Sequence, residues 1–307
     1  MKVSVIIPAV DGGKYLDGLF KTLSEQTIRP VQVLVIDSSS DGDTLTICKA
    51  SGADLIRIDS TTFDHGGTRN LAASKAKGKI FVFMTQDTLF KDETCLENLI
   101  NPLENPIIAA SFGRQIPAED TNPLETFVRS FNYPPTSMVK GIDDLPRLGV
   151  KTFFFSNVCS AIKKSAFEEV GRFPERTIMN EDMFLAAKLI MKGYKIAYQP
   201  HAIVYHSHNY SLTKQFKRYF DIGVFFTRNR WIKTPARSER EGIRYMKEMI
   251  RFLSVNGKRK WLPYALADTA IRFLGYRTGL FEATLPLGIK KRVSLNKNFW
   301  LDGNSFS

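Results

Sequence analysis

The sequence predicts an α/β fold in which a mainly parallel sheet is flanked by helices and followed by a basic helical extension. Short apolar runs alternate with longer amphipathic runs over the first hundred residues, as in βαβ units. Apolar residues are 43% of the 307 residues and aromatic residues 12%, enough for a packed core. After Ser211 the chain becomes helical and basic. We therefore expect a catalytic or binding domain over residues 1–210, with halves at about 1–105 and 106–210, and a separate region over 211–307.

The first half contains four predicted strands with helices between them. Short apolar runs bounded by turn-forming residues are typical of buried parallel strands. The strands cover Val3–Pro8, Val31–Asp37, Asp54–Asp59 and Ile80–Thr85, and the helices cover Tyr15–Gln26, Thr44–Ala50 and Thr68–Lys77. The turn PAVDGG after the first strand lacks the G-x-G-x-x-G pattern of a dinucleotide-binding fold, and no Walker sequence is present.

The second half has longer connections, marked by prolines at positions 117, 123, 134, 135 and 146. Residues 151–162 and 195–208 predict further strands, and Glu181–Lys192 between them predicts a helix. In the segment FDHGGTRN, Phe63–Asn70, we expect Gly66 and Gly67 to form a tight turn that lets the backbone approach a ligand. A phosphate-binding loop is not expected there, because the Walker lysine is missing.

Three widely spaced cysteines, Cys48, Cys95 and Cys159, predict neither a disulfide framework nor a Cys-rich zinc site. Such cysteine usage is typical of a reducing, cytoplasmic setting. We interpret MKVSVIIPAVDGG as a buried strand and not as a signal peptide, because it contains Pro8 and lacks a small-residue cleavage site. No run approaches the roughly 18 apolar residues of a spanning helix, so we do not expect the chain to cross a membrane.

Basic residues are concentrated in the C-terminal third. Residues 1–210 contain 23 Lys and Arg against 24 Asp and Glu, whereas residues 211–307 contain 20 against 7. This asymmetry predicts a polyanionic partner, either nucleic acid or an anionic membrane surface. No RNA- or DNA-reading motif is present and the acidic-leaning first two thirds would repel nucleic acid, so the membrane surface is the favoured partner.

The basic region has two parts. Residues 238–254 fit a helix with cations on one side and an apolar stripe on the other, and packing of this stripe in the core is the simplest interpretation. The stripe contains Ile243, Met246, Met249, Ile250 and Leu253. Residues 256–281 then interleave aromatic and basic side chains, which is typical of an interfacial segment.

Polar residues fall at the ends of the predicted strands, where ligands bind in a parallel sheet. Asp37 ends the second strand, FDHGGTRN follows the third and Asp87 follows the fourth. Either carboxylate alone fits a helix cap, but three polar strand ends together predict a shared site.

Two further motifs contain candidate catalytic groups. Glu181 and Asp182 of MNEDMF stand at a predicted helix start, where the helix dipole favours carboxylates, yet a hydroxyl nucleophile also needs a proton acceptor. His206 and His208 of YHSHN alternate, so both lie on one face of an extended segment. Such a pair fits either a metal site or polar packing.

These motifs resemble those of the inverting GT-A glycosyltransferases of family 2, and within them the bacterial rhamnosyltransferases that build cell-surface polysaccharides. The resemblance spans about residues 1–230 and rests on VSVIIPA, VLVIDSSSDGDT, FDHGGTRN, VFMTQD, FSNVCSAIKKSAFEEVGRFPE, NEDMFLAAK and HSHNYSLTKQFKRYFDIGVF. It implies a GT-A fold, with the nucleotide-sugar in the half before residue 105 and the acceptor in the half after it. The implied donor is dTDP-β-L-rhamnose, with a UDP-sugar as the alternative.

The resemblance also implies roles for individual residues. Nucleotide-sugar contacts are implied for Pro8, Ala9, Asp37, His65, Gly67, Arg69, Gln86 and Asp87. Asp87 and His206, with His208 as the alternative histidine, are implied ligands of Mn²⁺ or Mg²⁺. The usual D-x-D motif is here Thr85-Gln86-Asp87, which lacks the first carboxylate. Asp182 is the implied general base and Glu181 an acceptor-binding or neighbouring group, and an inactive scaffold is disfavoured because Asp37, Asp87, Asp182 and His206 are all present.

The setting follows from the same resemblance. The implied acceptor is a saccharide on a polyprenyl diphosphate, whose charge would attract the basic C-terminal region. We therefore expect a cytoplasmic protein held peripherally at the inner face of the cell membrane, and contacts of the C-terminal region with a second copy remain an alternative.

Overall fold

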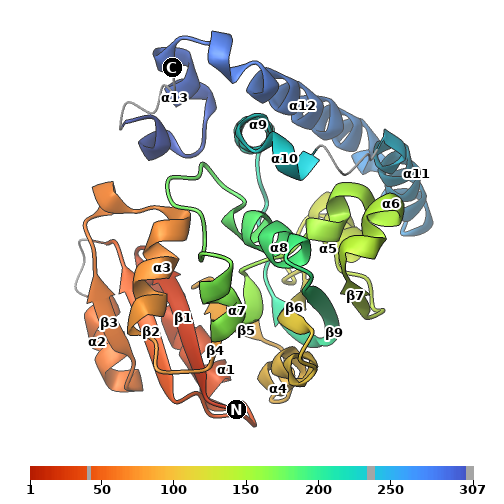
Figure 1. Ribbon diagram of the computed structural model, residues 1–307. Coiled ribbons are helices and arrows are strands. Elements are labelled where there is room, and N and C mark those ends of the chain that lie inside the picture. Colours follow the sequence, from red (N-terminus) through yellow and green to blue (C-terminus); the bar gives the residue numbers. More distant parts are fainter. Residues whose placement is uncertain (40–42, 234–238, 302–307) are drawn as a thin grey trace.

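The computed structural model describes residues 1–39, 43–233 and 239–301, and within these ranges it contains a nine-stranded mixed sheet (Figure 1). The strand order is β3-β2-β1-β4-β8-β6-β9-β5, and β7 pairs with β9 beside this path. The strands are β1 (Val3–Ala9), β2 (Gln32–Asp37), β3 (Asp54–Arg57), β4 (Ile80–Met84), β5 (Leu89–Phe90), β6 (Ile108–Ile116), β7 (Met138–Lys140), β8 (Cys159–Lys163) and β9 (Lys195–Tyr205).

The first four strands of this order are parallel, and β6 is parallel to β9. Strand β8 is antiparallel to both of its neighbours, β4 and β6. The predicted α/β fold with a mainly parallel sheet is therefore confirmed. Parallel strands end at one edge of the sheet, so residues that follow them are brought together there.

Helices cover both faces of the sheet, and the strands bury alternate residues on each side. They are α1 (Leu16–Ser24), α2 (Asp43–Ser51), α3 (His65–Lys75), α4 (Cys95–Ile100), α5 (Pro123–Asn132), α6 (Leu145–Leu148), α7 (Lys164–Glu169), α8 (Glu181–Met191), α9 (Leu212–Arg228), α10 (Arg230–Lys233), α11 (Glu239–Val255), α12 (Leu262–Leu280) and α13 (Leu287–Val293). Phe81 and Phe83 of β4 pack in one core cluster, whereas Val82 and Met84 pack in the other. This period of two fixes which face each strand residue presents.

Three predicted elements differ from the observed ones by three residues or more, and one of them, the strand predicted for residues 195–208, ends at Tyr205. The strand predicted for residues 151–162 is confined to Cys159–Lys163, because Gly149–Phe153 form a 3₁₀ helix. Helix α3 begins at His65 and not at Thr68, because the Asp64 carboxylate accepts a hydrogen bond from the Gly67 N–H and so caps the helix at that point.

Gly66 and Gly67 consequently lie in the first turn of α3, and the tight turn predicted for them is wrong. A Cβ atom added at Gly66 would come within 1.8 Å of the Pro174 carbonyl oxygen. Glycine is needed at position 66 because the helix packs directly against another backbone segment, not because a left-handed turn or a ligand requires it.

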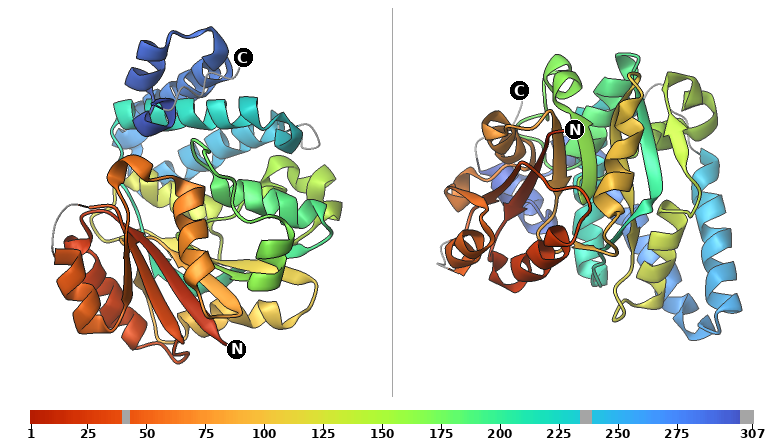
Figure 2. Two further views of the ribbon diagram at one scale, coloured as in Figure 1. Left: turned by 60° about the vertical axis from the view of Figure 1, so that its left-hand side comes forward. Right: turned by 90° about the horizontal axis from the view of Figure 1, so that it is seen from below.

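The C-terminal helices α9 to α13 lie over the side of the molecule at which the parallel strands end (Figures 1 and 2). Phe220, Phe225 and Trp300 from this region belong to the same core cluster as Phe83 of the sheet. The division of the chain at residue 210 stays a prediction. Among the described residues, no helix is long and apolar enough to span a membrane.

Helix α11 confirms part of the predicted apolar stripe, although Ser238 lies outside the described residues. Met249 and Leu253 are fully buried against Leu124 and Phe127 of α5. Ile243 and Ile250, in contrast, are exposed. The helix is thus attached to the core through Met249 and Leu253.

Candidate active site

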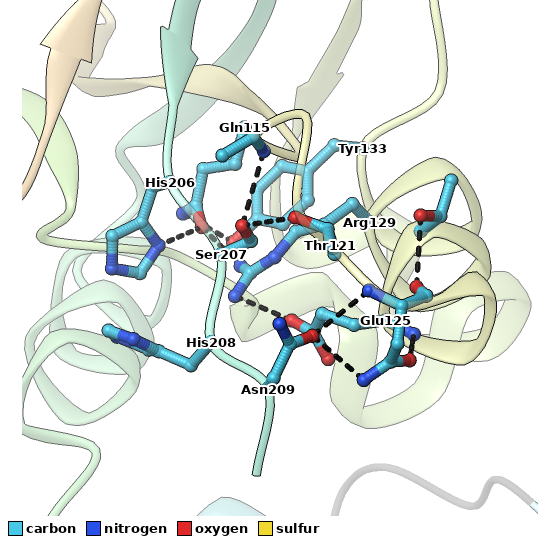
Figure 3. Close-up of polar contacts among 12 residues, drawn as sticks. Gln115, Thr121, Glu125, Arg129, Tyr133, His206, Ser207, His208 and Asn209 are labelled. Carbon is cyan, nitrogen blue, oxygen red and sulfur yellow. Dashed lines mark hydrogen bonds and ion pairs between the residues drawn. The ribbon is translucent and has the colours of Figure 1, made fainter.

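The predicted site residues that follow β4 and β9 meet at the carboxyl edge of the sheet. Asp87 comes three residues after β4 ends, and His206 and His208 follow β9 directly. The Asp87 Oδ2 atom lies 3.5 Å from His206 Nε2 and 3.4 Å from His208 Nε2. The two imidazole rings are 4.7 Å apart between centroids and lie side by side in Figure 3.

These three side chains can present one ligand atom each to a metal ion, with all three atoms within 4.8 Å of one another. Burial disfavours the Asp87 carboxylate, but hydrogen bonding to His206 and Thr85 holds the pKa of Asp87 well below its usual range. Burial and the adjacent His206 lower the pKa of His208 to about 4, so its ring is neutral near pH 7. A carboxylate with two imidazole nitrogens is a suitable donor set for Mn²⁺ or another divalent cation.

Gln115 of β6 orients the His206 ring for metal coordination. Its Oε1 atom accepts a hydrogen bond from Arg129, which can only donate, and faces His206 Nδ1 at 3.1 Å (Figure 3). Its amide nitrogen donates to the Tyr133 hydroxyl at 2.6 Å. The proton of His206 is therefore placed on Nδ1, which leaves the lone pair of Nε2 directed towards Asp87, as in other histidine ligands held by an outer hydrogen bond.

Asp182 lies at the start of α8 and is half-buried. Asn180, in the left-handed conformation at φ 58°, precedes this helix and turns the chain into it. The Asp182 carboxylate accepts hydrogen bonds from the backbone N–H groups of Met183 at 2.7 Å and Asn157 at 3.3 Å. Burial and the negative charge of Glu181 nevertheless raise the pKa of Asp182 to about 7. Such a carboxylate is poised to accept a proton near neutral pH.

Glu181 and Arg69 face each other inside the protein. Arg69 Nη1 lies 3.1 Å from Glu181 Oε1 and also donates to the His65 carbonyl oxygen. Asn157 donates to the same Glu181 oxygen. Burial opposes ionisation of Glu181, but Arg69 holds its pKa below the usual value. The guanidinium of Arg69, predicted to contact the nucleotide, is thus engaged with Glu181, and Glu181, predicted to contact the acceptor, is only 6% exposed.

Asp37 is the last residue of β2 and is completely buried. Its Oδ1 atom accepts hydrogen bonds from the backbone and hydroxyl of Ser39. Its Oδ2 atom has no hydrogen-bond partner among the described residues. A buried carboxylate oxygen without a partner is costly, so this atom is suited to accept a hydrogen bond from a ligand.

The remaining predicted contacts surround this edge. Pro8 and Ala9 end β1 beside Asp37, as expected from their register with β2. Gln86, predicted as a donor contact, holds the Val10 backbone at two points, 2.9 Å at N–H and 2.8 Å at the carbonyl. Its amide therefore fixes the segment after β1.

His65 and Gly67 lie at the start of α3 and are held by protein groups. His65 Nε2 lies 3.3 Å from Asn296 Oδ1 of the C-terminal segment. The Gly67 N–H is taken by the Asp64 cap. Both residues line a cleft of about 900 Å³ between the α3 start, residues 175–178 and residues 295–301.

Sequence reasoning missed Gln115 and Asn157, which connect the predicted residues. Asn157 stands in the motif FSNVCSAI, so its position in a conspicuous segment was the available signal. Gln115 stands in an ordinary strand and gave no signal, because its role depends on β6 lying next to β9.

The family model for Glycosyl transferase family 2 matches residues 4–171. The chain is 42% identical over 303 residues to the O-antigen chain rhamnosyltransferase RfbN of Salmonella typhimurium, covering 98% of this chain and 96% of the relative. It is 41% identical over 300 residues to the O-antigen chain rhamnosyltransferase WbaN of Salmonella anatum, covering 97% and 95%.

Solved structures share the fold at low sequence identity. The mannosyltransferase PcManGT from Pyrobaculum calidifontis, in complex with GDP-Man and Mn²⁺, superposes with a TM-score of 0.63 at 16% identity, covering 92% of this chain and 87% of that one. Residues 1–349 of S. aureus TarS superpose with a TM-score of 0.55 at 16% identity, covering 91% and 90%. These likenesses extend beyond the sheet into the C-terminal helices.

Proposed function

The chain belongs to glycosyltransferase family 2, and from this premise we propose that it transfers L-rhamnose from dTDP-β-L-rhamnose, with inversion, to a saccharide hydroxyl. The observation that carries the choice of sugar is the 42% identity to an O-antigen rhamnosyltransferase over nearly the whole length of both chains. The acceptor in this proposal is a saccharide linked to a polyprenyl diphosphate, and the product enters a surface polysaccharide.

The nucleoside of the donor would bind at the end of β2. The Asp37 Oδ2 atom, buried and without a protein partner among the described residues, would accept a hydrogen bond from the base or the ribose. Pro8 and Ala9 would lie beside it, because β1 and β2 end together. His65, Gly67, Arg69 and Gln86 would shape this side of the site through the backbone segments that they hold.

Asp87, His206 and His208 would hold the divalent cation, with Mn²⁺ favoured over Mg²⁺ by the two imidazole ligands. Their donor set fits the ion, since Gln115 directs the His206 lone pair and the His208 ring is neutral. When bound, such a cation stabilises the negative charge that develops on the departing diphosphate.

Asp182 would serve as the general base. Its carboxylate would take the proton of the acceptor hydroxyl while that oxygen bonds to the anomeric carbon and the bond from this carbon to the dTDP oxygen breaks. Attack from the face opposite the nucleotide inverts the configuration. In place of a direct acceptor contact, we assign Glu181 to positioning: with Arg69 and Asn157 it fixes the start of α8 and its charge keeps Asp182 basic.

A location at the inner face of the membrane is supported by helix α12. Its buried face carries charged residues, whereas its exposed face is apolar. Its inner face carries Asp268, Arg272 and two glycines, whereas its outer face exposes Leu266, Phe273 and Leu274. On the helix that borders the molecule in Figure 1, this outer face forms an apolar strip without a partner among the described residues.

We assign this strip to an anionic lipid surface and not to a second copy of the chain. The exposed cations Lys258, Arg259 and Lys260 come directly before α12, and Arg277 lies within its outer face. Residues 211–307 carry 20 basic against 7 acidic residues, so two copies meeting there would place like charges together. An anionic bilayer attracts the same cations and accepts the apolar side chains.

Donor screening tests the proposed reaction. Purified protein would be given dTDP-β-L-rhamnose or UDP-hexoses, each with Mn²⁺, Mg²⁺ or EDTA, and release of nucleoside diphosphate would be measured. We expect release from dTDP-rhamnose that depends on the divalent cation. A clear preference for a UDP-sugar would reject rhamnose transfer, and full activity in EDTA would reject the metal site.

A further inference from the structure

A second cleft, of about 360 Å³, lies next to the metal cluster between α5, α9, α11 and α12. Its walls combine aromatic rings with cations: Tyr133, Phe154, Tyr210, Arg129, Lys151 and Arg218. None of these residues was predicted to bind a ligand. In Figure 3, Gln115 lies between His206 on one side and Arg129 and Tyr133 on the other, so the cleft adjoins the metal cluster through Gln115.

The cleft is connected to both parts of the catalytic centre. The Tyr210 ring lies 5.2 Å from the His208 ring. Arg129 and Tyr133 are both hydrogen-bonded to Gln115, which holds His206. The Gln115 amide also donates to the Ser156 hydroxyl at 2.9 Å, and the N–H of the next residue, Asn157, donates to the Asp182 carboxylate at 3.3 Å, so the proposed base lies near the cleft.

The charges of the cleft are only partly compensated by protein groups. Arg129 is paired with Glu125, 2.8 Å away, and Arg272 with Asp268, 2.5 Å away. Arg218 has no carboxylate within ion-pair distance in the described part of the chain, and its guanidinium lies over the Tyr210 ring at 5.7 Å. An arginine that lies over an aromatic ring and has no carboxylate partner can form charge-assisted hydrogen bonds with a phosphate group.

The position of the cleft separates it from the donor nucleotide. Asp37 ends β2, on one side of β4 in the sheet, whereas Gln115 and His206 belong to β6 and the end of β9 on the other side. Asp87, after β4, stands between them. A nucleotide that binds at Asp37 and places its diphosphate at Asp87 would therefore lie on the β2 side of β4. The cleft on the β6 side would stay open to a second substrate.

Building on the proposed transfer reaction, we propose that this cleft binds the acceptor as a saccharide diphosphate. The sugar packs against Tyr210, because aromatic rings present flat apolar faces to the C–H face of a sugar. Arg218 binds the diphosphate. The reactive hydroxyl is then directed towards Asp182. Helix α12, which supplies Arg272 to the cleft and Phe273 to the outer face, would place the cleft beside the lipid surface.

Steady-state kinetics with the variant Arg218→Gln test this assignment. The acceptors are hexoses on a short prenyl diphosphate and the same hexoses as plain methyl glycosides. We expect Arg218→Gln to raise the KM for the diphosphate acceptor on the order of 10–100-fold, since it removes a charge-assisted hydrogen bond. Release of dTDP without acceptor should stay within about twofold, and Arg218→Lys should recover part of the loss because it keeps the charge.

Lys214→Gln is the matched control, because Lys214 has the same charge, lies one turn earlier on α9 and is exposed outside the cleft. It should leave every KM unchanged. An unchanged KM of the diphosphate acceptor in Arg218→Gln would overturn the assignment, and an equal rise with the methyl glycosides would overturn the diphosphate contact. If wild type releases no dTDP from dTDP-rhamnose, the proposed function fails instead, so the two failures are distinguishable.

Discussion

Arg69 and Glu181 form an ion pair inside the protein, with 3.1 Å between Nη1 and Oε1 and side-chain exposures of 6% and 8%. The pair joins the second turn of α3 to the first turn of α8, two helices that are more than a hundred residues apart in the sequence. Asp182 follows Glu181 directly, so the geometry of the proposed base depends on this contact.

The substitution Arg69→Met should destabilise the protein by about 3–5 kcal/mol, because it leaves Glu181 buried without a cation. The double variant Arg69→Met with Glu181→Gln should recover most of that loss in urea unfolding. The exposed pair Arg147–Asp144 is the control, and Arg147→Met should change stability by less than about 1 kcal/mol. Wild-type stability of Arg69→Met together with a loss of dTDP affinity would instead support the predicted nucleotide contact.

Asp182→Asn should reduce rhamnosyl transfer on the order of 10²–10⁴-fold, because general-base catalysis contributes that much. Binding of dTDP, measured by calorimetry, should stay close to that of wild type. The same substitution at the exposed Asp120 should have no effect on turnover. Near-normal transfer by a folded Asp182→Asn protein would show that another group accepts the proton.

The pH dependence should follow the raised pKa of Asp182. Transfer should fall about tenfold per pH unit below about 7, as the base becomes protonated. The folded-state pKa lies above the ordinary value of 3.8, so ionised Asp182 lowers stability, and this cost develops above pH 4 and is complete above about 7. Asp182→Asn should therefore be more stable than wild type at pH 8 but not near pH 4. Equal stabilities at pH 8 would contradict the shift.

Substitution of either histidine in the cluster should abolish tight Mn²⁺ binding, because the structure directs both towards Asp87. Gln115→Leu should weaken Mn²⁺ binding about 10–100-fold, since it frees the orientation of His206. His201→Ala is the control, because that histidine is exposed on β9. Calorimetric titration with Mn²⁺ measures all four variants, and unaltered binding in His208→Ala would leave His206 as the sole histidine ligand.

The charge-introducing variants Phe273→Asp and Leu274→Asp should lose flotation with vesicles that contain anionic lipid, because they place a carboxylate on the apolar strip of α12. Ile107→Asp, at an exposed apolar residue outside the basic region, should float like wild type. Neutral vesicles should bind more weakly than anionic ones. If the α12 variants instead convert a dimer to a monomer and flotation is unchanged, the strip contacts a second copy.

Local pattern was sufficient for the elements of the first half and for several site residues. The strands that end at Asp37 and precede Asp87 were predicted within about two residues, because each is a continuous apolar run buried on both faces. The alternation of His206 and His208 correctly suggested a shared face, and the structure adds that both reach Asp87. The start of α3 was misplaced, because two glycines in a helix are locally unfavourable and only the close approach of Pro174 explains Gly66.

The sequence by itself thus determined the sheet, the helices and which polar residues stand at strand ends, since these depend on periodicity within short segments. The tertiary structure alone decided which of these residues contact each other. It paired Arg69 with Glu181, placed Gln115 behind His206 and turned the apolar face of α12 outward. Such contacts depend on the strand order and on helix packing, which join residues far apart in the chain and are not encoded in any local pattern.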